Sequence, residues 1–493
     1  MMPSRTGRFR LAPRLIGFAA ALYAIIWVSG FPRHYDDEEL HRDPPPDKPA
    51  GLKLPYPLEF DHIIVSVKTT AVDAYDLLPP LLLLTEQKYY DSMILMSDLR
   101  MDLGAFHIED VLDRYTMEFI SSQPQLERYA QQLHYYRYKI DIDPLREDNH
   151  AREREVQSNL DKYKMLRMLH RAWELRPERK WYVFAQADAY LNRNNLEAWL
   201  GQYDSSEPTM FANSPDPSLP EPSALGGTTF VVSVQVMRNL FKDRENNLNQ
   251  WNQKIQDFPS SFETLHTALT TEISVDLNST WPGLSGFHPA TVPYGAGMWC
   301  EPVIALHSVS PQARSDIWRF EHDRTELHHV RDPLTFADLW GRFLQAEDMA
   351  HYRENWDNLS SGPDNAKWNI LFEGVQYSTH AQHHLHHHTI RDTKGNAPAG
   401  ENSWESCQEA CNNHEHCMQW SYSSSATPNW NENGKTRCHL SRSMRLGEYK
   451  GPIEIEREGE ETQKIEWKSG WRKDRFEAWA RNQRCKGQQN KKN

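Results

Sequence analysis

The chain has 493 residues, of which 39% are hydrophobic and 25% are charged, so it is long enough for two or three domains and apolar enough to bury a core. Its formal net charge of -13 argues against nucleic acid as a partner, because phosphate binding needs a basic face. The sequence contains neither a Walker loop nor a glycine-rich dinucleotide-binding loop.

The N-terminus predicts a membrane anchor. Residues 1–14 contain four arginines and no acid, and the stretch 15–31 carries no charge. This stretch is short but can span a thin bilayer, and its basic flank predicts that the tail before it is cytoplasmic. A cleaved signal peptide is the alternative, which the small residues at 28–30 would permit. The bulky side chains of Trp27 and Phe31 favour an uncleaved signal-anchor.

We therefore expect a single-pass type II protein of the Golgi or endoplasmic reticulum membrane with a lumenal globular part. Residues 32–59 are rich in proline and charge, which predicts an extended stem. Two sequons, at Asn278 and Asn358, predict N-glycosylation and are typical of a lumenal chain.

Three short apolar runs, each followed by polar residues, predict buried strands. The runs are 63–67, 93–96 and 181–185, and the polar residues after them are Lys68-Thr69-Thr70, Ser97-Asp98 and Gln186-Ala187-Asp188. Helical patterns separate the runs, notably at 161–175, so the sequence predicts an open, mainly parallel α/β sheet. Ligands bind beyond the carboxyl ends of such strands, which makes these polar residues the first candidates for a site.

Two further stretches have a functional and a plain structural interpretation. Gly226 and Gly227 precede the apolar run 230–233, where they would allow the backbone to approach a ligand closely or would simply form a tight turn. A histidine-rich stretch lies within 365–400 and could bind metal. Because no acid or cysteine completes a site there, we expect a solvated linker, which we place at 361–402.

The order of several motifs resembles the fungal branch of the Fringe-like family 31 glycosyltransferases. The matching stretches are VKTTAVDAYDLLP (67–79), ILMSDL (94–99), LDKYKML (160–166), KWYVFAQADAYL (180–191), LGGTTFVVS (225–233), WPGLSGFHP (281–289), GMWCEPVIALHSV (297–309) and WRFE (318–321). The resemblance covers about residues 60–360. It implies a GT-A (Rossmann-like) fold, a UDP-sugar donor, a divalent metal that is usually Mn²⁺, a glycan or glycoprotein acceptor, and inverting, β-1,3-type transfer.

The resemblance also assigns roles to single residues. Asp188 matches the last acid of the family's D-x-D-type motif, but Gln186 replaces an acid, so one negative charge near the metal is missing. His307 matches the family's metal-ligand histidine. To the donor site the resemblance assigns Lys68, Thr69, Asp98, Asp161, Lys162, Gln186, Gly226 and Gly227. A metal is needed because it offsets the charge of the departing pyrophosphate.

The catalytic base is expected at Glu263, which the family register reaches by counting back from Trp281-Pro282. A carboxylate there could deprotonate the acceptor hydroxyl, although the cysteine and glycine of the family's motif are absent. Glu272 and Asp276 are the fallback candidates.

Each of these roles has a structural alternative. Asp188 could cap a helix, His307 could be a structural histidine, and Glu263 could be a solvated surface acid. Gln186 and the altered base motif also favour a second function, that of a catalytically degenerate glycosyltransferase-fold protein that binds glycans or proteins. A secreted lectin-like protein is a third possibility and would require cleavage near residue 30.

The C-terminal cysteines predict a small disulfide-stapled module in an oxidising compartment. Four cysteines lie between 407 and 438, and their spacing alone allows three pairings; zinc is less favoured because no Cys-x2-Cys pair occurs. Residues 403–446 resemble a PAN/apple-like module, which implies the bonds Cys407–Cys438 and Cys411–Cys417. Such a module could dock an acceptor or act as a structural cap. A Cys300–Cys485 bond is also possible. Residues 447–493, which include Cys485, are expected to form a C-terminal tail.

Overall fold

The computed structural model describes residues 62–213, 228–242, 247–327, 329–330, 332–344, 349, 352–360, 369–372, 400, 403–423, 438–455, 463–483 and 485. The predicted anchor and stem, the glycine pair Gly226-Gly227 and the histidine-rich stretch lie outside these residues. Within them, no helix has both the length and the apolar character needed to cross a membrane.

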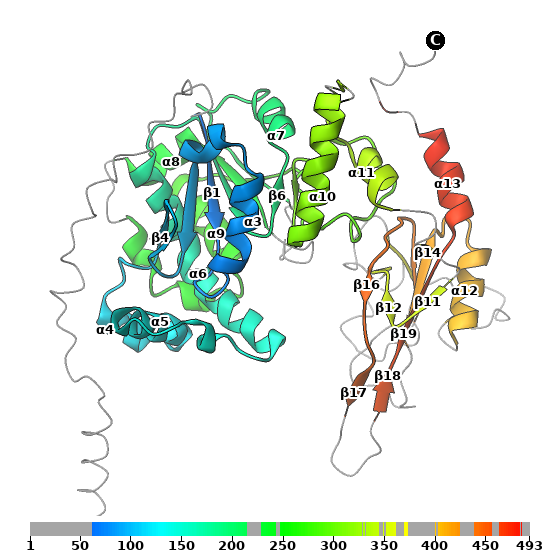
Figure 1. Cartoon of the computed structure of the whole chain (residues 1–493), viewed down its shortest axis with the longest axis horizontal. Helices are drawn as coiled ribbons and strands as arrows, with labels where there is room; N and C mark the ends of the chain where they lie inside the picture. The colour runs from blue at the N-terminus through cyan, green and yellow to red at the C-terminus, as the bar shows by residue number, and fades with distance from the viewer. Residues whose placement is uncertain are drawn as a thin grey trace, which may run out of the picture.

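An eight-stranded sheet in the order β3-β4-β2-β1-β5-β8-β7-β9 forms the centre of the first part of the chain (Figure 1). Its strands are β1 (Ile63–Lys68), β2 (Met93–Ser97), β3 (Met101–Leu103), β4 (Phe106–Asp110), β5 (Trp181–Gln186), β7 (Met210–Ala212), β8 (Phe230–Ser233) and β9 (Leu277–Ser279). Strands β4, β2, β1 and β5 run parallel, whereas β8 is antiparallel to both of its neighbours. The three predicted strands are therefore adjacent, and the sheet is mixed α/β with a parallel centre, as expected.

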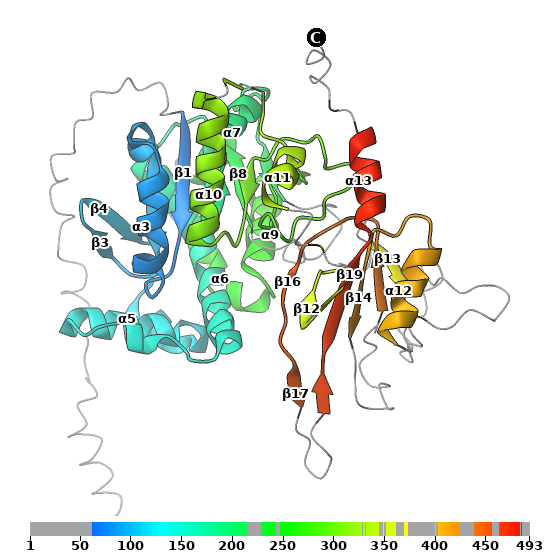
Figure 2. The same cartoon turned by 45° about the vertical axis from the view of Figure 1, so that its right-hand side comes forward.

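Helices cover both faces of this sheet. Alternate residues of β1 enter different cores, because Ile64 packs with α6 (His150–Leu175), α8 (Val234–Phe241) and α9 (Ser261–Ile273), whereas Val65 packs with α3 (Ala74–Leu84) and α7 (Arg193–Leu200). A strand buried on both faces has a continuous apolar sequence. Helix α10 (Pro311–His322) lies beside α3 with β1 visible between them (Figure 2).

The shorter elements complete this part. They are α4 (Met117–Ser122), α5 (Glu127–Tyr138), the 3₁₀ segments η2 (Gln87–Ser92), η3 (Pro124–Leu126), η4 (Asp143–Leu145), η6 (Asn247–Trp251) and η7 (Ile255–Asp257), the π segment η8 (Asp323–Leu327), α11 (Phe336–Phe343), and the two-stranded sheet of β6 (Tyr190–Leu191) and β10 (Ala305–Leu306).

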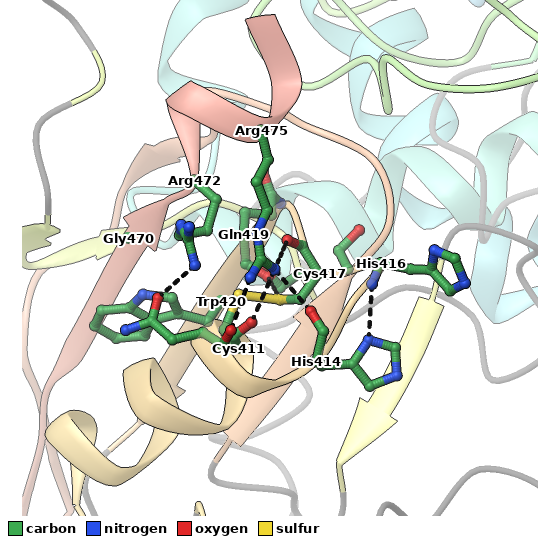
Figure 3. Close-up of a disulfide and its surroundings, with 12 residues drawn as sticks. Cys411, His414, His416, Cys417, Gln419, Trp420, Gly470, Arg472 and Arg475 are labelled. Atoms are coloured by element: carbon green, nitrogen blue, oxygen red, sulfur yellow. Dashed lines mark hydrogen bonds between the residues drawn. A yellow bond between two sulfur atoms is a disulfide. The ribbon is translucent and has the colours of Figure 1, made fainter. Parts of the chain in front are cut away.

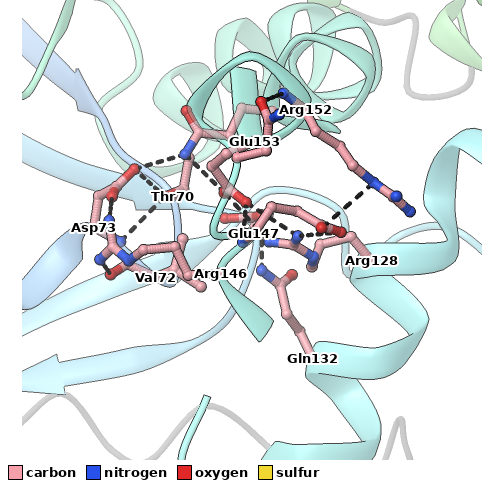
Figure 4. Close-up of polar contacts among 12 residues, drawn as sticks. Thr70, Val72, Asp73, Arg128, Gln132, Arg146, Glu147, Arg152 and Glu153 are labelled. Atoms are coloured by element: carbon pink, nitrogen blue, oxygen red, sulfur yellow. Dashed lines mark hydrogen bonds and ion pairs between the residues drawn. The ribbon is translucent and has the colours of Figure 1, made fainter. Parts of the chain in front are cut away.

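A polar network fixes the start of α6 beside the loop that follows β1 (Figure 4). The buried Arg128 of α5 bonds the carboxylate of Glu153 at 3.1 Å. Asp73, in the loop, accepts hydrogen bonds from Arg146 at 2.7 Å and from Gln157 of α6 at 2.9 Å. Because Arg128 and Glu153 pair with each other, neither charge is buried alone. The network therefore holds α6 at a fixed position relative to the carboxyl end of β1.

The C-terminal part contains a five-stranded sheet in the order β11-β19-β14-β15-β13. Its strands are β11 (Tyr352–Glu354), β13 (Asn369–Phe372), β14 (Gln419–Ser423), β15 (Cys438–Ser441) and β19 (Trp467–Trp471), and around it lie α12 (Trp404–Asn413), α13 (Lys473–Asn482) and the strand pairs β12 (Trp356–Asp357) with β16 (Glu448–Tyr449) and β17 (Ile453–Ile455) with β18 (Gln463–Ile465).

This sheet corrects the predicted boundaries. The expected catalytic region 60–360, linker 361–402 and tail 447–493 each contribute a strand to it, so the module is larger than 403–446. The cysteine spacing predicted only the disulfide-bonded part of the module, because the outer strands β11 and β13 are short and contain no cysteine. The structure has the bonds Cys407–Cys438 and Cys411–Cys417, and also Cys300–Cys485.

Candidate functional site

Polar side chains from neighbouring strands come together at the carboxyl edge of the parallel sheet. Lys68 at the end of β1 is directly opposite Gln186 at the end of β5. The backbone continues this pairing, since Ala187 N–H donates to the Lys68 carbonyl at 2.8 Å and Thr69 N–H donates to the Met96 carbonyl at 2.8 Å. The parallel register therefore gathers residues that lie far apart in the sequence.

Asp161 lies between two lysines at this edge. Lys68 forms an ion pair with its carboxylate, and the fully buried Lys164 pairs with the same carboxylate at 2.8 Å. Lys164 also donates to the Thr69 carbonyl at 3.3 Å. Burial alone would raise the pKa of Asp161, but the charges of Lys164 and Lys68 outweigh it and lower this pKa to about 2. Asp161 therefore stays ionised and holds the ammonium groups of Lys68 and Lys164 in fixed positions.

Asp188 and His307, which are far apart in the sequence, meet at the same edge. Val309 N–H donates to the Asp188 carbonyl at 3.0 Å, and the Ser308 N–H lowers the pKa of the Asp188 carboxyl, which burial raises more strongly. Burial, together with the positive charge of Lys68, lowers the pKa of His307 to about 3. The imidazole is therefore neutral at physiological pH, the form in which histidine binds metals.

The remaining hydrogen bonds of this pair leave two atoms available. His307 Nε2 lies 2.6 Å from the Thr229 hydroxyl, whereas His307 Nδ1 and Asp188 Oδ1 are buried without a hydrogen-bond partner. An imidazole nitrogen and a carboxylate oxygen are ordinary ligands for a divalent metal. No group of three or more His, Cys, Asp or Glu side chains with metal-binding geometry occurs in the described part of the chain. The residues fit a metal that takes its other ligands from a substrate or from water.

A cleft of about 310 Å³ adjoins this cluster. One wall is a polar stripe on α6 formed by Arg154, Gln157, Ser158 and Asp161. The opposite side includes Thr228, next to the histidine's partner Thr229, and the start of α9. The sequence prediction named only Asp161 from this stripe. The spacing of i, i+3, i+4 and i+7 on one helix face could have indicated the others.

Glu263 occupies a structural position in α9. Ser260, Ser261 and Phe262 line the cleft, but Glu263 is not among the described residues that do so. Its backbone N–H donates to the hydroxyl of the N-cap Ser260 at 3.1 Å, and an acid in the first turn also complements the helix dipole. The fallback Glu272 accepts a hydrogen bond from the Trp251 indole at 3.0 Å. Neither geometry supplies a base that faces the cleft.

Two of the residues expected in the donor site lie elsewhere. Asp98 is fully buried, and its carboxylate accepts hydrogen bonds from the Ala71 N–H at 2.8 Å and from the Gln132 amide at 3.2 Å, so it holds the loop after β1 in place. Lys162 follows Asp161 on α6 and therefore points about 100° away around the helix. It is not among the described residues that line the cleft.

The two sequons differ in the folded chain. Asn358 is fully buried, and its amide donates to the carbonyls of Trp420 at 3.0 Å and Gly470 at 3.3 Å. A glycan cannot be attached to that amide in this fold, so the expectation for Asn358 was wrong. Asn278 lies on the edge strand β9 and is exposed, which leaves its glycosylation as a prediction.

Comparisons with known proteins give little more. No protein-family model matches the chain, and no curated protein matches it. One solved structure that does match is described as a glycosyltransferase involved in the glycosylation of the major capsid of PBCV-1. The match has 16% sequence identity and a TM-score of 0.20, and it covers 42% of this chain and 95% of that chain. At this TM-score the likeness carries no argument, so function has to be argued from the site.

Proposed function

We propose that the chain is a membrane-anchored glycosyltransferase of the Golgi or endoplasmic reticulum lumen. It transfers a sugar from a UDP-sugar to a glycan or glycoprotein acceptor, with inversion, in the β-1,3 class, and it depends on a divalent metal such as Mn²⁺. The proposal is supported by the backbone pairing of Val309 with Asp188, which brings Asp188 beside the segment of His307, and by the charge of Lys68, which acts on the pKa of both residues. These residues lie at the carboxyl edge of a parallel sheet, where ligands of such sheets bind.

The cleft has features that suit a nucleoside diphosphate. Arg154 lines it with a guanidinium, whose planar fork matches phosphate oxygens. The N-terminal turn of α9 lines it too, and free N–H groups at a helix start favour anions. Asp161, which lines the cleft, holds the positive charges of Lys68 and Lys164 beside it.

In this proposal Asp188 Oδ1 and His307 Nδ1 hold the metal, because these are the buried atoms without hydrogen-bond partners. A bound Mn²⁺ would offset the charge of the departing diphosphate. Thr229 orients the imidazole through its hydrogen bond to Nε2, which is the usual way in which the free nitrogen of a metal-binding histidine is fixed. Burial, together with the smaller effect of the Lys68 charge, lowers the pKa of His307 and so keeps the imidazole neutral and able to act as a ligand.

A second candidate is a glycosyltransferase-fold protein that binds a nucleotide or glycan without transferring sugar. Two observations favour it: Gln186 stands where an acid is expected, and Glu263 is not among the described residues that line the cleft. Both candidates share the donor site and differ only in whether a base reaches the acceptor.

Calorimetry of UDP binding by the full-length chain, with and without Mn²⁺, tests the donor site. Asp188→Asn should weaken the Mn²⁺-dependent part of UDP binding at least tenfold, because it removes the metal's one anionic ligand. Asp76→Asn is the matched control, since Asp76 is exposed and pairs only with Arg146. Equal Mn²⁺ dependence in the wild-type chain and the Asp188 variant would refute the proposed metal site.

Sugar transfer by the wild-type chain separates the two candidates, and Glu263→Gln tests whether Glu263 is the base. If Glu263 is the base, the variant should bind UDP like the wild-type chain and lose sugar transfer by at least a hundredfold. UDP release is the measurement, over a panel of UDP-sugars with glycan and glycoprotein acceptors. A wild-type chain that binds UDP but releases none from any donor would establish the second candidate. Full activity in the variant would move the base to another residue.

A further inference from the structure

A second cavity, of about 190 Å³, lies on the opposite face of the sheet from the cleft. Its floor consists of Val65 and Val67 of β1, Met93 of β2 and Ala185 of β5. These side chains belong to the face covered by α3, whereas the cleft lies on the face covered by α6 and α9. The two cavities share no lining residue in the described part of the chain. They are therefore separate sites.

The walls of this cavity come from α3 and α10, which contact each other; in the view of Figure 2, β1 is visible between them. Leu81 and Leu84 of α3 form an apolar wall. Trp318 of α10 stacks on His322 at 5.0 Å and forms an aromatic wall opposite. The floor and these two walls are thus suited to an apolar group.

Arg193 is one of several polar residues that line the rest of the cavity, together with Glu86, Arg314, Glu321 and Glu326. Its guanidinium lies over the ring of Tyr89 at 4.8 Å and lines the cavity. Within the described residues, it makes no hydrogen bond or ion pair at the distances that define one. The acids nearby have other partners: Glu86 pairs with Lys88 at 2.8 Å, and Glu321 accepts a hydrogen bond from the Tyr190 hydroxyl at 2.6 Å. Burial lowers the pKa of Arg193 to about 10, and the nearby Tyr89 and Glu197 offset only part of that effect.

The position of Arg193 does not serve the helix either. It is the first residue of α7, directly after the N-cap Asn192, whose side chain accepts from the Asn195 N–H at 2.8 Å. A cation in the first turn opposes the helix dipole. Arg193 is therefore unfavourable both for α7 and for burial, and both costs are offset once an anion pairs with its guanidinium.

We propose that this cavity binds a small monocarboxylate with an apolar body. The carboxylate pairs with Arg193, and the apolar body lies on Val65, Val67 and Met93. Size supports a small ligand, because sites for drug-sized molecules have roughly 300–1,000 Å³. Charge supports a monoanion, because a diphosphate would meet one unpaired guanidinium and the acids Glu86 and Glu321. The proposal does not rest on the glycosyltransferase function.

The cavity also has a route to the candidate metal site. Arg314 of α10 lines the cavity and donates to the Ala187 carbonyl at 2.6 Å. Its charge also lowers the pKa of Asp188, which follows Ala187, against the larger effect of burial. Arg314 therefore lies between the cavity and the segment that contains Asp188.

Calorimetry of the full-length chain with phenylacetate and with the neutral isostere phenylacetamide tests the proposal. Phenylacetate should bind once per chain, and phenylacetamide should bind at least tenfold more weakly. Saturating UDP should leave the affinity for phenylacetate unchanged. No saturable binding of phenylacetate, equal binding of the amide, or competition with UDP would each overturn the assignment. None of these measurements requires a variant to fold.

Two variants locate the probe. Arg193→Met should weaken phenylacetate at least tenfold, and Leu84→Trp should prevent binding by filling the cavity while leaving the guanidinium in place. Arg152→Met is the control, because Arg152 is 70% exposed and pairs with Glu147. Unchanged binding in folded Arg193→Met or Leu84→Trp would place the probe elsewhere and refute the proposal.

Discussion

At the residue scale, Asp161 decides how the positive charges of the candidate site are held. Its carboxylate pairs with Lys68 and Lys164, and the pKa of Asp161 is lowered from 3.8 to about 2. A carboxyl whose folded pKa is depressed stabilises the fold at pH values above its ordinary pKa. That contribution is lost as the pH falls from about 4 to about 2.

We expect Asp161→Asn to lower the free energy of unfolding at pH 7 by about 3–5 kcal/mol, because two buried ammonium groups lose their partner. The loss of stability between pH 4 and pH 2 should also be shallower than in the wild-type chain. Urea unfolding at a series of pH values measures both effects. Asp113→Asn is the control, because Asp113 forms an ion pair with Arg171 at the surface, where such a pair contributes at most about 1 kcal/mol. A loss no larger than that of the control would contradict the pairing.

Gln186 and Glu263 show how a residue can match a family register without having the family's chemistry. Gln186 lies opposite Lys68, at the expected end of β5, but its amide has no charge to offer a metal. Glu263 is in the expected region but in the first turn of α9, where it complements the helix start. The family's sequence register predicts where a residue lies along a helix or strand. It does not predict which residues line the cleft, because that depends on the direction in which each side chain points.

At the element scale, Arg475 joins α13 to the stapled loop after α12, and Arg472, the N-cap of α13, also donates to the Asn412 side chain at 2.8 Å. Arg475 donates to the carbonyls of Cys411 at 3.3 Å, Asn412 at 2.7 Å, His414 at 2.7 Å and Cys417 at 3.1 Å (Figure 3). These include the last carbonyls of α12, which have no partner within the helix. The Arg475 guanidinium therefore caps α12 and helps to hold α13 against the Cys411–Cys417 bond.

Arg475→Met should destabilise the C-terminal part by about 2–3 kcal/mol, because several charge-assisted hydrogen bonds are lost and carbonyls are left unpaired. Hydrogen exchange of α12 and α13, followed by mass spectrometry, should show faster exchange there and little change in β1 and β5. Arg481→Met, at an exposed position of the same helix, is the matched control. Equal exchange in the two variants would mean that the carbonyls are satisfied without Arg475.

At the scale of the whole molecule, one hydrophobic core joins the two parts of the chain. Phe476 of α13 packs on Trp340 of α11 with ring centroids 4.3 Å apart and on Trp299 at 5.8 Å. The bond Cys300–Cys485 links the same regions. The C-terminal part is therefore not an independent domain, because α13 shares a hydrophobic core with the residues that precede His307 in the sequence.

Phe476→Ala should lower the free energy of unfolding by about 3–5 kcal/mol, because it removes a fully buried ring between two tryptophans. The loss should appear in both parts of the chain as a shift of one common thermal transition, since the core is shared. Calorimetry measures the transition, and Glu477→Ala in the same helix is the control. Two separate transitions, with only the later one shifted, would show that the parts unfold independently.

The sequence by itself determined much of the central sheet and the chemistry gathered at its edge. Continuous apolar runs predicted β1, β2 and β5, because strands buried on both faces have no polar positions, and polar residues marked where these strands end. The cysteine cluster predicted a stapled module. These are local signals, and each can be recognised within a short stretch of the chain.

Only the tertiary structure decided the rest. The stripe that contains Arg154, the partner Thr229, the buried state of Asn358 and the cavity at Arg193 depend on which elements pack together and which way their side chains point. The same is true of the five-stranded sheet, whose outer strands take their partners from distant parts of the chain. Short strands form because they pair with other strands and become buried. Their sequences are too short to show the alternation of apolar and polar residues that would predict a strand.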